Sequence, residues 1–410
     1  MPPFIKRHVA DDAYHVSHPA YLMGYRASSQ AEGRIMDLHT FLHLMVEKRA
    51  SDLFLSSGGR PSIKIDGQTH HIGEVRLTAE QVHAMAFSVM NERQQREFES
   101  ILEMNLAINL AEVGRFRINI YRQRGDVAMV VRYITSQIPS IEALNLPSIL
   151  KDLVALPRGL ILVVGATSSG KSTCLASMVD YRNSTRTGHI LTIEEPIEYL
   201  HLHKESVVDQ REIGLDTLSY ANALKNAMRE APDVILIGEI RDREIMQQAI
   251  AYSETGHLCL ATLHANNASQ TLDRIINFFP EVARQQLLID MSLNLKAVVS
   301  LRLLRGTDGK RIPAVELMLS TPYVSDLIAK GEIHKLRDAI KQGKEQGMQL
   351  FDDALYQLHV VGRINYQQAL EAADSQTDLA LRFRLDGLAP ADDSSSPRLD
   401  DYVEGLETPH

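Results

Sequence analysis

Residues 159–173 read Gly159-Leu160-Ile161-Leu162-Val163-Val164-Gly165-Ala166-Thr167-Ser168-Ser169-Gly170-Lys171-Ser172-Thr173. The apolar run predicts a buried strand, and the glycine-bounded loop after it ends in Lys-Ser-Thr, where a helix is expected to begin. Such a loop directs backbone N–H groups toward phosphates, its lysine reaches the outer phosphates, and Ser172 is placed to ligate Mg2+. The nine residues from Gly165 to Thr173 are therefore predicted to bind a nucleoside triphosphate.

Two further apolar runs deliver carboxylates that such a site needs. Val234-Ile235-Leu236-Ile237-Gly238-Glu239 predicts a strand that ends in Glu239, which can hold the hydration shell of Mg2+ or polarise an attacking water. The stretch Ile193-Glu194-Glu195-Pro196-Ile197-Glu198 places three carboxylates after another buried strand, an arrangement that is costly unless cations offset it. We expect Mg2+ ligands at Ser172, Glu195 and Glu239, with Glu194 and Glu198 beside them.

Two histidines flank a fourth predicted strand. His257 and His264 bracket the run from Leu258 to Leu263. A zinc site made with Cys259 is disfavoured, because alternate positions of a strand point to opposite faces. We expect both histidines to contact the γ-phosphate instead.

Composition limits the class of protein. The chain has 410 residues, 44% of them hydrophobic and 23% charged, which suits a two-domain globular protein. No apolar run approaches the roughly 20 residues that a membrane-spanning helix requires. Two cysteines favour a reducing, cytoplasmic compartment. The net charge of −9 is concentrated in the tail after residue 385, so charge gives no case for nucleic-acid binding.

The chain divides into five predicted segments. Residues 1–35 are expected to be a disordered N-terminal extension, with Met36 as the natural start. Residues 36–138 predict a small α+β domain, with helical apolar spacing from Leu38 to Val46 and short strands before and after a helix from Thr78 to Glu99. A linker at 139–148 leads to the nucleotide-binding domain, 149–385, with a parallel sheet and C-terminal helices. Residues 386–410 predict a disordered acidic tail.

These motifs together resemble the secretion and pilus motor ATPases, the family of the type IV pilus retraction ATPases. The resemblance covers residues 36 to about 385. GATSSGKST is similar to the family's Walker A box, ILTIEEPIEY to its aspartate box, APDVILIGEIRD to its Walker B box and TGHLCLATLHANNA to its histidine box. The sequence departs from the family at Glu195, where an aspartate is usual.

The resemblance implies a fold and a set of roles. The fold is α/β, with a PAS-like N-terminal domain, a RecA-like P-loop domain and assembly into a hexameric ring. ATP and Mg2+ are the implied ligands, with Glu239 as catalytic glutamate, Glu194 and Glu198 as supporting carboxylates, and both histidines near the γ-phosphate. Arginines of the N-terminal domain approach the nucleotide of a neighbouring subunit in such rings, and the candidates here are Arg117 and Arg132.

Within this family the chain is most similar to the retraction branch. Extension and type II secretion motors usually carry a four-cysteine zinc element, for which this chain lacks the cysteines. Phe54 and the stretch 323–330 are similar to the accessory retraction ATPase rather than to the principal one. The resemblance implies a cytoplasmic motor that acts with the principal retraction ATPase and docks on the inner-membrane platform protein of the pilus. Three alternatives stay open: a principal retraction ATPase, a ring-forming adaptor whose hydrolysis is dispensable, and a DNA translocase.

Overall fold

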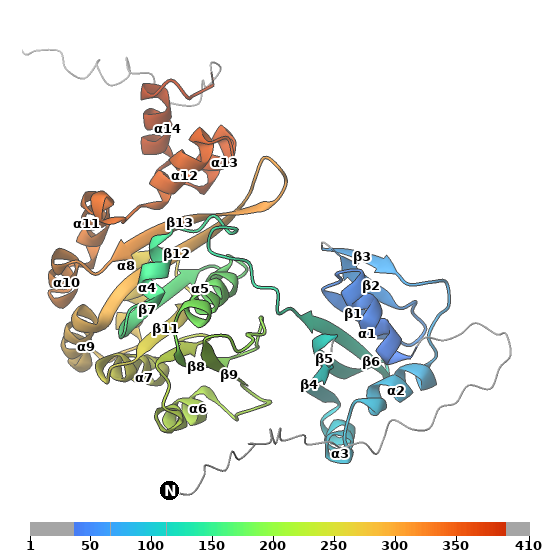
Figure 1. The fold of residues 1–410 in the computed structure, drawn as a ribbon. Coiled ribbons are helices and arrows are strands. Elements are labelled where there is room, and N and C mark those ends of the chain that lie inside the picture. The colour runs from blue at the N-terminus through green and yellow to red at the C-terminus, as the bar shows by residue number, and fades with distance from the viewer. Residues whose placement is uncertain (1–36, 66, 112, 391–410) are drawn as a thin grey trace, which may run out of the picture.

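The computed structural model describes residues 37–65, 67–111 and 113–390, and its two β-sheets are built from separate stretches of the chain (Figure 1). The expected extension at 1–35 and most of the expected tail at 386–410 lie outside the described residues. Together the described parts form an α/β fold. Among the described residues, no helix has the length and apolar character needed to cross a membrane.

The described residues of the N-terminal part form three helices and a six-stranded sheet. In chain order these are α1 (Leu38–Glu47), β1 (Asp52–Ser56), β2 (Ser62–Ile65), β3 (Gln68–His71), α2 (Ala79–Ser88), α3 (Glu92–Ile101), β4 (Glu103–Leu110), β5 (Gly114–Gln123) and β6 (Asp126–Ile134). The strands form an antiparallel sheet in the order β3-β2-β1-β6-β5-β4. Apolar residues of the helices and strands share one core, which includes Phe41, Leu53, Phe98 and Phe116.

The single helix expected from Thr78 to Glu99 is wrong, because two helices occupy this stretch. Thr78 caps α2, and its side chain accepts a hydrogen bond from the Gln81 backbone. Asn91 starts α3 in the same manner, and Gln94 returns a bond to the Asn91 backbone N–H. This reciprocal capping satisfies N–H groups at a new helix start and so favours a break at Asn91.

The second part carries the other sheet. Its elements up to that sheet's last strand are α4 (Ile149–Val154), β7 (Gly159–Gly165), α5 (Lys171–Thr185), β8 (Gly188–Glu194), β9 (Ser206–Glu212), α6 (Tyr220–Ala227), a 3-10 turn η1 (Met228–Glu230), β10 (Val234–Ile237), α7 (Arg243–Glu254), β11 (Leu258–Leu263), α8 (Ala268–Asn277), α9 (Glu281–Asn294), β12 (Leu295–Arg305) and β13 (Arg311–Leu319). The strand order is β13-β12-β7-β11-β10-β8-β9. All neighbours are parallel except β12 and β13, so the sheet is mixed.

Strand β7 shows why its sequence is apolar on both faces. Leu160, Leu162 and Val164 belong to a core shared with α6 to α9. Ile161 and Val163, which alternate with them, belong to a second core shared with α4 and α5. Every residue of β7 is buried. Since burying one such side chain stabilises a fold by roughly 1.5–3 kcal/mol, this strand anchors the loop that follows it.

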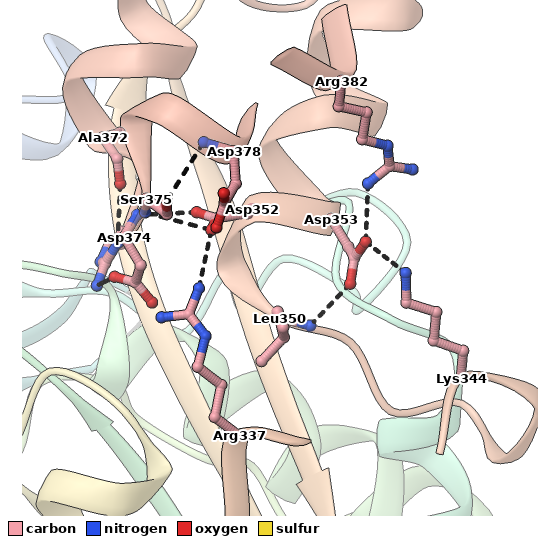
Figure 2. A network of polar contacts seen from close by, with 11 residues as sticks. Arg337, Lys344, Leu350, Asp352, Asp353, Ala372, Asp374, Ser375, Asp378 and Arg382 are labelled. Atoms are coloured by element: carbon pink, nitrogen blue, oxygen red, sulfur yellow. Dashed lines mark hydrogen bonds and ion pairs between the residues drawn. The ribbon is translucent and has the colours of Figure 1, made fainter. Parts of the chain in front are cut away.

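The C-terminal helices extend from the end of the sheet. They are α10 (Pro322–Ala329), η2 (Ile333–Lys335), α11 (Leu336–Gln342), η3 (Lys344–Gln346), α12 (Phe351–Val360), α13 (Tyr366–Ala372) and α14 (Gln376–Leu385). Helices α12 to α14, orange to red in Figure 1, share a core with Ile312 and Ala314 of β13. Figure 2 shows the polar network at their base, where Asp352 accepts bonds from the Asp374 and Ser375 backbones.

The two parts touch around the segment that joins them. Thr135, just after β6, forms an isolated bridge with Tyr199, and the Leu200 N–H donates to the Thr135 carbonyl at 3.0 Å. Further along, the Ser177 hydroxyl of α5 donates to the Pro139 carbonyl. The connection is therefore held against the second part before it enters α4.

Candidate nucleotide site

The loop after β7 adopts a backbone that requires glycine at its start. Gly165 has φ 152°, and a Cβ there would lie 2.6 Å from the Leu301 carbonyl oxygen of the neighbouring strand. Gly170 has φ 95° and directly precedes α5, which begins at Lys171. Both conformations are unfavourable for residues with a side chain. Residues 166–169 therefore lead directly into the N-terminus of α5, and the N-terminus of a helix favours an anion.

Lys171 lies within this loop. Its Nζ donates hydrogen bonds to the carbonyl oxygens of Gly165 and Ala166, at 2.9 and 2.8 Å. It also lies 3.5 Å from His264 Nδ1. Burial lowers the pKa of the lysine, and the nearby charge of Glu239 opposes that shift. Because charged oxygens bind an ammonium group more strongly than neutral carbonyls do, a phosphate could take over these bonds.

A hollow of about 370 Å3 lies beside the loop. Its wall is formed by the start of α5 and by segments that follow β8, β10 and β11. The charged and imidazole side chains on this wall are Lys171, Glu194, Glu195, Glu198, His201, Glu239 and His264. The structure thus brings together most of the residues that the sequence singles out.

Strand register explains why the carboxylates converge. Ile237 of β10 lies between Ile193 of β8 and Ala261 of β11. The Gly238 N–H donates to the Ile193 carbonyl at 2.8 Å, so the chain after β10 stays beside β8. Glu239 therefore leaves the same edge of the sheet as the acidic stretch after β8, as carboxyl ends of parallel strands do.

Glu239 occupies the centre of a chain of polar contacts. One carboxylate oxygen lies 3.1 Å from His264 Nε2, and the other accepts a bond from Arg241 Nε at 2.7 Å. Arg241 also donates to Glu195 at 2.6 Å. His264 extends this series of contacts to Lys171. A carboxylate held on both sides can orient a water molecule in the adjoining hollow.

Glu194, the last residue of β8, accepts hydrogen bonds from two side chains. Its carboxylate accepts bonds from the Thr192 hydroxyl at 2.7 Å and from Gln210 Nε2 at 3.3 Å. Burial raises the pKa of Glu194 to about 7, with smaller contributions from the negative charges of Glu198 and Glu212. The two donors partly offset that rise. Glu198 lies on the wall of the same hollow.

The structure does not bring His257 to this site, which corrects the expectation that both histidines flank a phosphate. His257 precedes β11 and lies beside Gly159 at the start of β7, where its carbonyl accepts the Gly159 N–H at 3.0 Å. Its ring contacts Thr255 and the Tyr252 carbonyl. The phosphate loop follows the opposite end of β7, about 20 Å away at the usual rise of a strand.

The two candidate arginines have partners within their own chain. Arg132 Nε binds Asp52 at 2.8 Å, and Arg117 lies 3.6 Å from Glu212 at the end of β9. Arg117 and Arg132 are direct cross-strand neighbours. Neither lies on the wall of the hollow.

Sequence reasoning missed three residues that shape the site. Arg241 bridges Glu239 and Glu195, and Thr262 donates its hydroxyl to the Gly238 carbonyl. Tyr199 contacts Thr173 of α5, with 3.0 Å between their hydroxyl oxygens. Arg241 follows Glu239 by two residues, so its position in the stretch similar to the Walker B box could have marked it as a site residue. No comparable pattern marks the other two.

Comparisons with known proteins show which proteins this chain is similar to. A family model described as Type II/IV secretion system protein matches residues 29–348. The type IV pilus ATPase PilU of Pseudomonas aeruginosa is 51% identical over 362 residues, which cover 88% of this chain and 95% of that protein. The type IV pilus retraction ATPase PilT of the same organism is 40% identical over 338 residues, 82% of this chain and 98% of that protein. A crystal structure of the pilus retraction motor PilT with bound ADP matches with a TM-score of 0.78 and 38% identity, over 83% of this chain and 98% of that one.

Proposed function

Because the chain belongs to the type II/IV secretion system protein family, we propose that it is an ATP-hydrolysing motor that assists type IV pilus retraction. One observation carries the chemical part of this proposal: Lys171, His264 and Glu239 are linked side by side at a phosphate-binding loop. The motor part rests on the similarity to PilU and PilT over most of their length.

The proposed ATP site uses the loop and its hollow. Backbone N–H groups of residues 165–173 bind the phosphates, and Lys171 exchanges its two carbonyl partners for phosphate oxygens. A second hollow of about 270 Å3 adjoins Gly170 and Thr173 and is lined by Leu144 and Leu303. Its apolar wall suits the adenine base.

Mg2+ fits the oxygen donors at the site. Hydroxyl and carboxylate oxygens are the ligands that this ion prefers, and it usually keeps several waters and phosphate oxygens as well. Ser172, Glu195 and Glu239 are the proposed ligands, and all three line the hollow. The bound ion would neutralise charge on the phosphates during transfer to water.

Glu239 is the proposed catalytic carboxylate. It accepts a proton or a hydrogen bond from the attacking water, while His264 fixes its orientation through the 3.1 Å contact. Glu194 and Glu198 support the hydrogen-bonded water around it. Arg117 and Arg132 are proposed to act on the nucleotide of a neighbouring subunit, which would require them to exchange Glu212 and Asp52 for phosphate.

The proposed assembly is a hexameric ring. In it, residues 36–138 act as a PAS-like domain and residues 149–385 as a RecA-like ATPase domain, joined by 139–148. We place the ring at the cytoplasmic face of the inner membrane, where it would act with the principal retraction ATPase on the platform protein. A principal motor or a passive ring-forming adaptor remain the alternatives that the experiment below separates.

The first test measures Mg2+-dependent ATP hydrolysis by the full chain and by Lys171→Ala and Glu239→Gln. Both substitutions should reduce kcat by a factor of about 100 or more, since Lys171 is proposed to bind the transferring phosphate and Glu239 to orient the attacking water. Turnover that survives Lys171→Ala would overturn the site.

The second test uses cells that lack both retraction ATPases. The chain is supplied alone or with a PilT whose Walker A lysine is disabled. Retraction only in the paired strain supports the accessory motor, and retraction with the chain alone indicates a principal motor. Retraction in neither strain, together with rescue by Glu239→Gln in cells that lack only this chain and keep an intact PilT, indicates an adaptor.

A further inference from the structure

A buried carboxylate outside the nucleotide hollow has no part in the roles described so far. Glu316 lies in β13 and is only 3% exposed. Burial raises the pKa of Glu316 to about 7. Burying a carboxyl group costs free energy unless it gains bonds that only it can make.

Glu316 bonds to the first residue of the helix that follows His264. One carboxylate oxygen accepts the Ala268 backbone N–H at 2.8 Å and the Ser300 hydroxyl at 3.3 Å. Arg302, whose positive charge lowers the pKa of Glu316, donates hydrogen bonds instead to Asp374 at 2.5 Å and to the Ala372 carbonyl at 2.8 Å. Among these contacts, the hydrogen bond from the Ala268 N–H is the shortest that the Glu316 carboxylate makes.

Helix α8 does not need this hydrogen bond merely to begin. Its cap residue, Asn267, already accepts the Gln270 N–H at 2.9 Å, as an N-cap side chain should. Glu316 adds a second attachment from a strand far away in the sequence. Capping of α8 does not require a buried carboxylate from another strand, so the hydrogen bond between Glu316 and Ala268 needs another explanation.

Strand register shows what this hydrogen bond holds in place. Glu316 is opposite Ser300, Ser300 is beside Val164, and Val164 is beside Leu263. These four residues form one row across β13, β12, β7 and β11, directly below the phosphate loop. After Leu263 the chain makes the short segment 264–267 and meets Glu316 at residue 268. That segment lines a hollow with Gly165 and Ala166.

The segment is thus attached at both ends. Leu263 fixes one end through the sheet, and the Glu316 bond to Ala268 fixes the other end across two strands. His264, the first residue between these attachments, contacts both Lys171 and Glu239. A small displacement of a positioned catalytic group can lower a rate strongly.

We propose that Glu316 is a positioning residue for ATP hydrolysis, which by binding the Ala268 N–H holds the segment 264–267 so that His264 meets Glu239. This inference rests on the proposed function. It assigns to β13, at the edge of the sheet, a direct effect on the catalytic carboxylate.

The test compares two substitutions of similar size in the full chain. Glu316→Gln keeps an oxygen that can accept the Ala268 N–H, whereas Glu316→Met fills the space without an acceptor. Asn365→Ala, which removes the N-cap side chain of α13, is the matched control for loss of a helix cap elsewhere. Each variant is assayed for kcat per folded molecule, for the Kd of a fluorescent ATP analogue and for its melting temperature.

The expected result is a fall in kcat of about ten-fold or more for Glu316→Met, with the Kd changed by less than about threefold. Glu316→Gln and Asn365→Ala should stay within about threefold of the wild-type kcat. Equal loss in the Gln and Met variants would overturn the proposal, as would a loss in Asn365→Ala as large as in Glu316→Met. Should Glu316→Met fail to fold, Glu316→Ala, which admits water to the N–H, takes its place.

A double-mutant cycle with His264→Ala separates positioning from a general structural effect. If Glu316 acts through His264, Glu316→Met should change kcat by less than about twofold once His264 is absent. The same fold-loss in both backgrounds would overturn the proposal. Lys171→Ala in the same assay reports on the site itself: turnover that survives it refutes the proposed function, whereas turnover lost in Lys171→Ala but normal in Glu316→Met refutes only the role of Glu316.

Discussion

His264 Nε2 lies 3.1 Å from a carboxylate oxygen of Glu239, while Nδ1 of the same ring lies 3.5 Å from the Lys171 ammonium. One imidazole therefore contacts the group proposed to bind phosphate and the group proposed to orient water. Binding of a phosphate to Lys171 can therefore shift Glu239 through their shared contact with His264.

Replacing His264 by alanine should slow hydrolysis without weakening ATP binding. We expect kcat to fall by roughly 10²-fold, because Glu239 loses one of its two orienting partners, and the Kd for an ATP analogue to change little. Steady-state assays and fluorescence titration measure the two quantities. His257→Ala is the matched control, since that ring lies at the opposite end of β11 from His264. A weaker Kd with unchanged kcat would contradict this role.

Arg241→Ala should lower the Mg2+ concentration needed for half-maximal activity. Arg241 now binds both Glu195 and Glu239, so it competes with a cation for these carboxylates. The variant should also lose roughly ten-fold in kcat, because Glu239 is less well oriented. The measurement is a Mg2+ titration of ATPase activity at saturating nucleotide. Arg243→Ala, which removes an arginine stacked on Phe279, serves as control, and equal shifts in both variants would argue against competition.

The stability of the chain should depend on pH through Glu316. Its pKa is raised from 4.5 when unfolded to about 7 when folded, with burial as the largest cause and the charge of Asp374 adding to it, while Ala268, Ser300 and Arg302 oppose it. The folded state therefore binds more protons between these values, and stability falls as pH rises through this window.

Glu316→Gln should remove this dependence. Between pH 5.5 and 8 the variant should gain about 2 kcal/mol relative to wild type, which corresponds to roughly 4–8 °C in melting temperature for a domain of this size. Thermal unfolding at both pH values measures the difference. A constant difference between the two proteins would show that Glu316 does not titrate in this range.

Arg117→Ala should destabilise the contact between the two parts of the chain. Glu212 is 1% exposed at its side chain and lies 3.6 Å from Arg117, and burial raises the pKa of Glu212 while Arg117 lowers it. Loss of the arginine leaves a buried carboxylate without its counter-ion, at a cost of about 2 kcal/mol. Glu212→Gln in the same background should restore most of that loss. Melting temperatures of the two single variants and the double variant decide the point.

Local pattern was sufficient for the buried parallel strands that precede the site segments. The apolar runs of β7, β8, β10 and β11 lie where the sequence predicts strands, because a strand covered on both faces must be apolar along its whole length. The break at Asn91 was missed because a capping box inside a polar helix leaves no gap in the apolar pattern.

Features that depend on tertiary pairing could not be read in the same way. His257 and His264 both flank β11, and only the direction of the strand decides which of them reaches the loop. Arg241 lies in the same box as Glu239, but its contact with Glu195 spans 46 residues along the chain. Glu316 looks like an ordinary charged residue in sequence, and its contact with Ala268 spans 48 residues. Such contacts depend on which strands are neighbours and in which register, and the local sequence pattern does not determine either.

The bridge between Thr135 and Tyr199 has a mechanical consequence. Tyr199 contacts Thr173, the last residue of the phosphate-binding motif, so one side chain separates the nucleotide loop from the chain that leaves the N-terminal sheet. A shift of α5 by a fraction of an ångström would act on the sheet at the end of β6, and the edge farthest from that point, at β3, would move through a larger arc. In such a movement the short connection would be the pivot, and the amplitude at the sheet edge would depend on the width of the sheet rather than on a long flexible hinge.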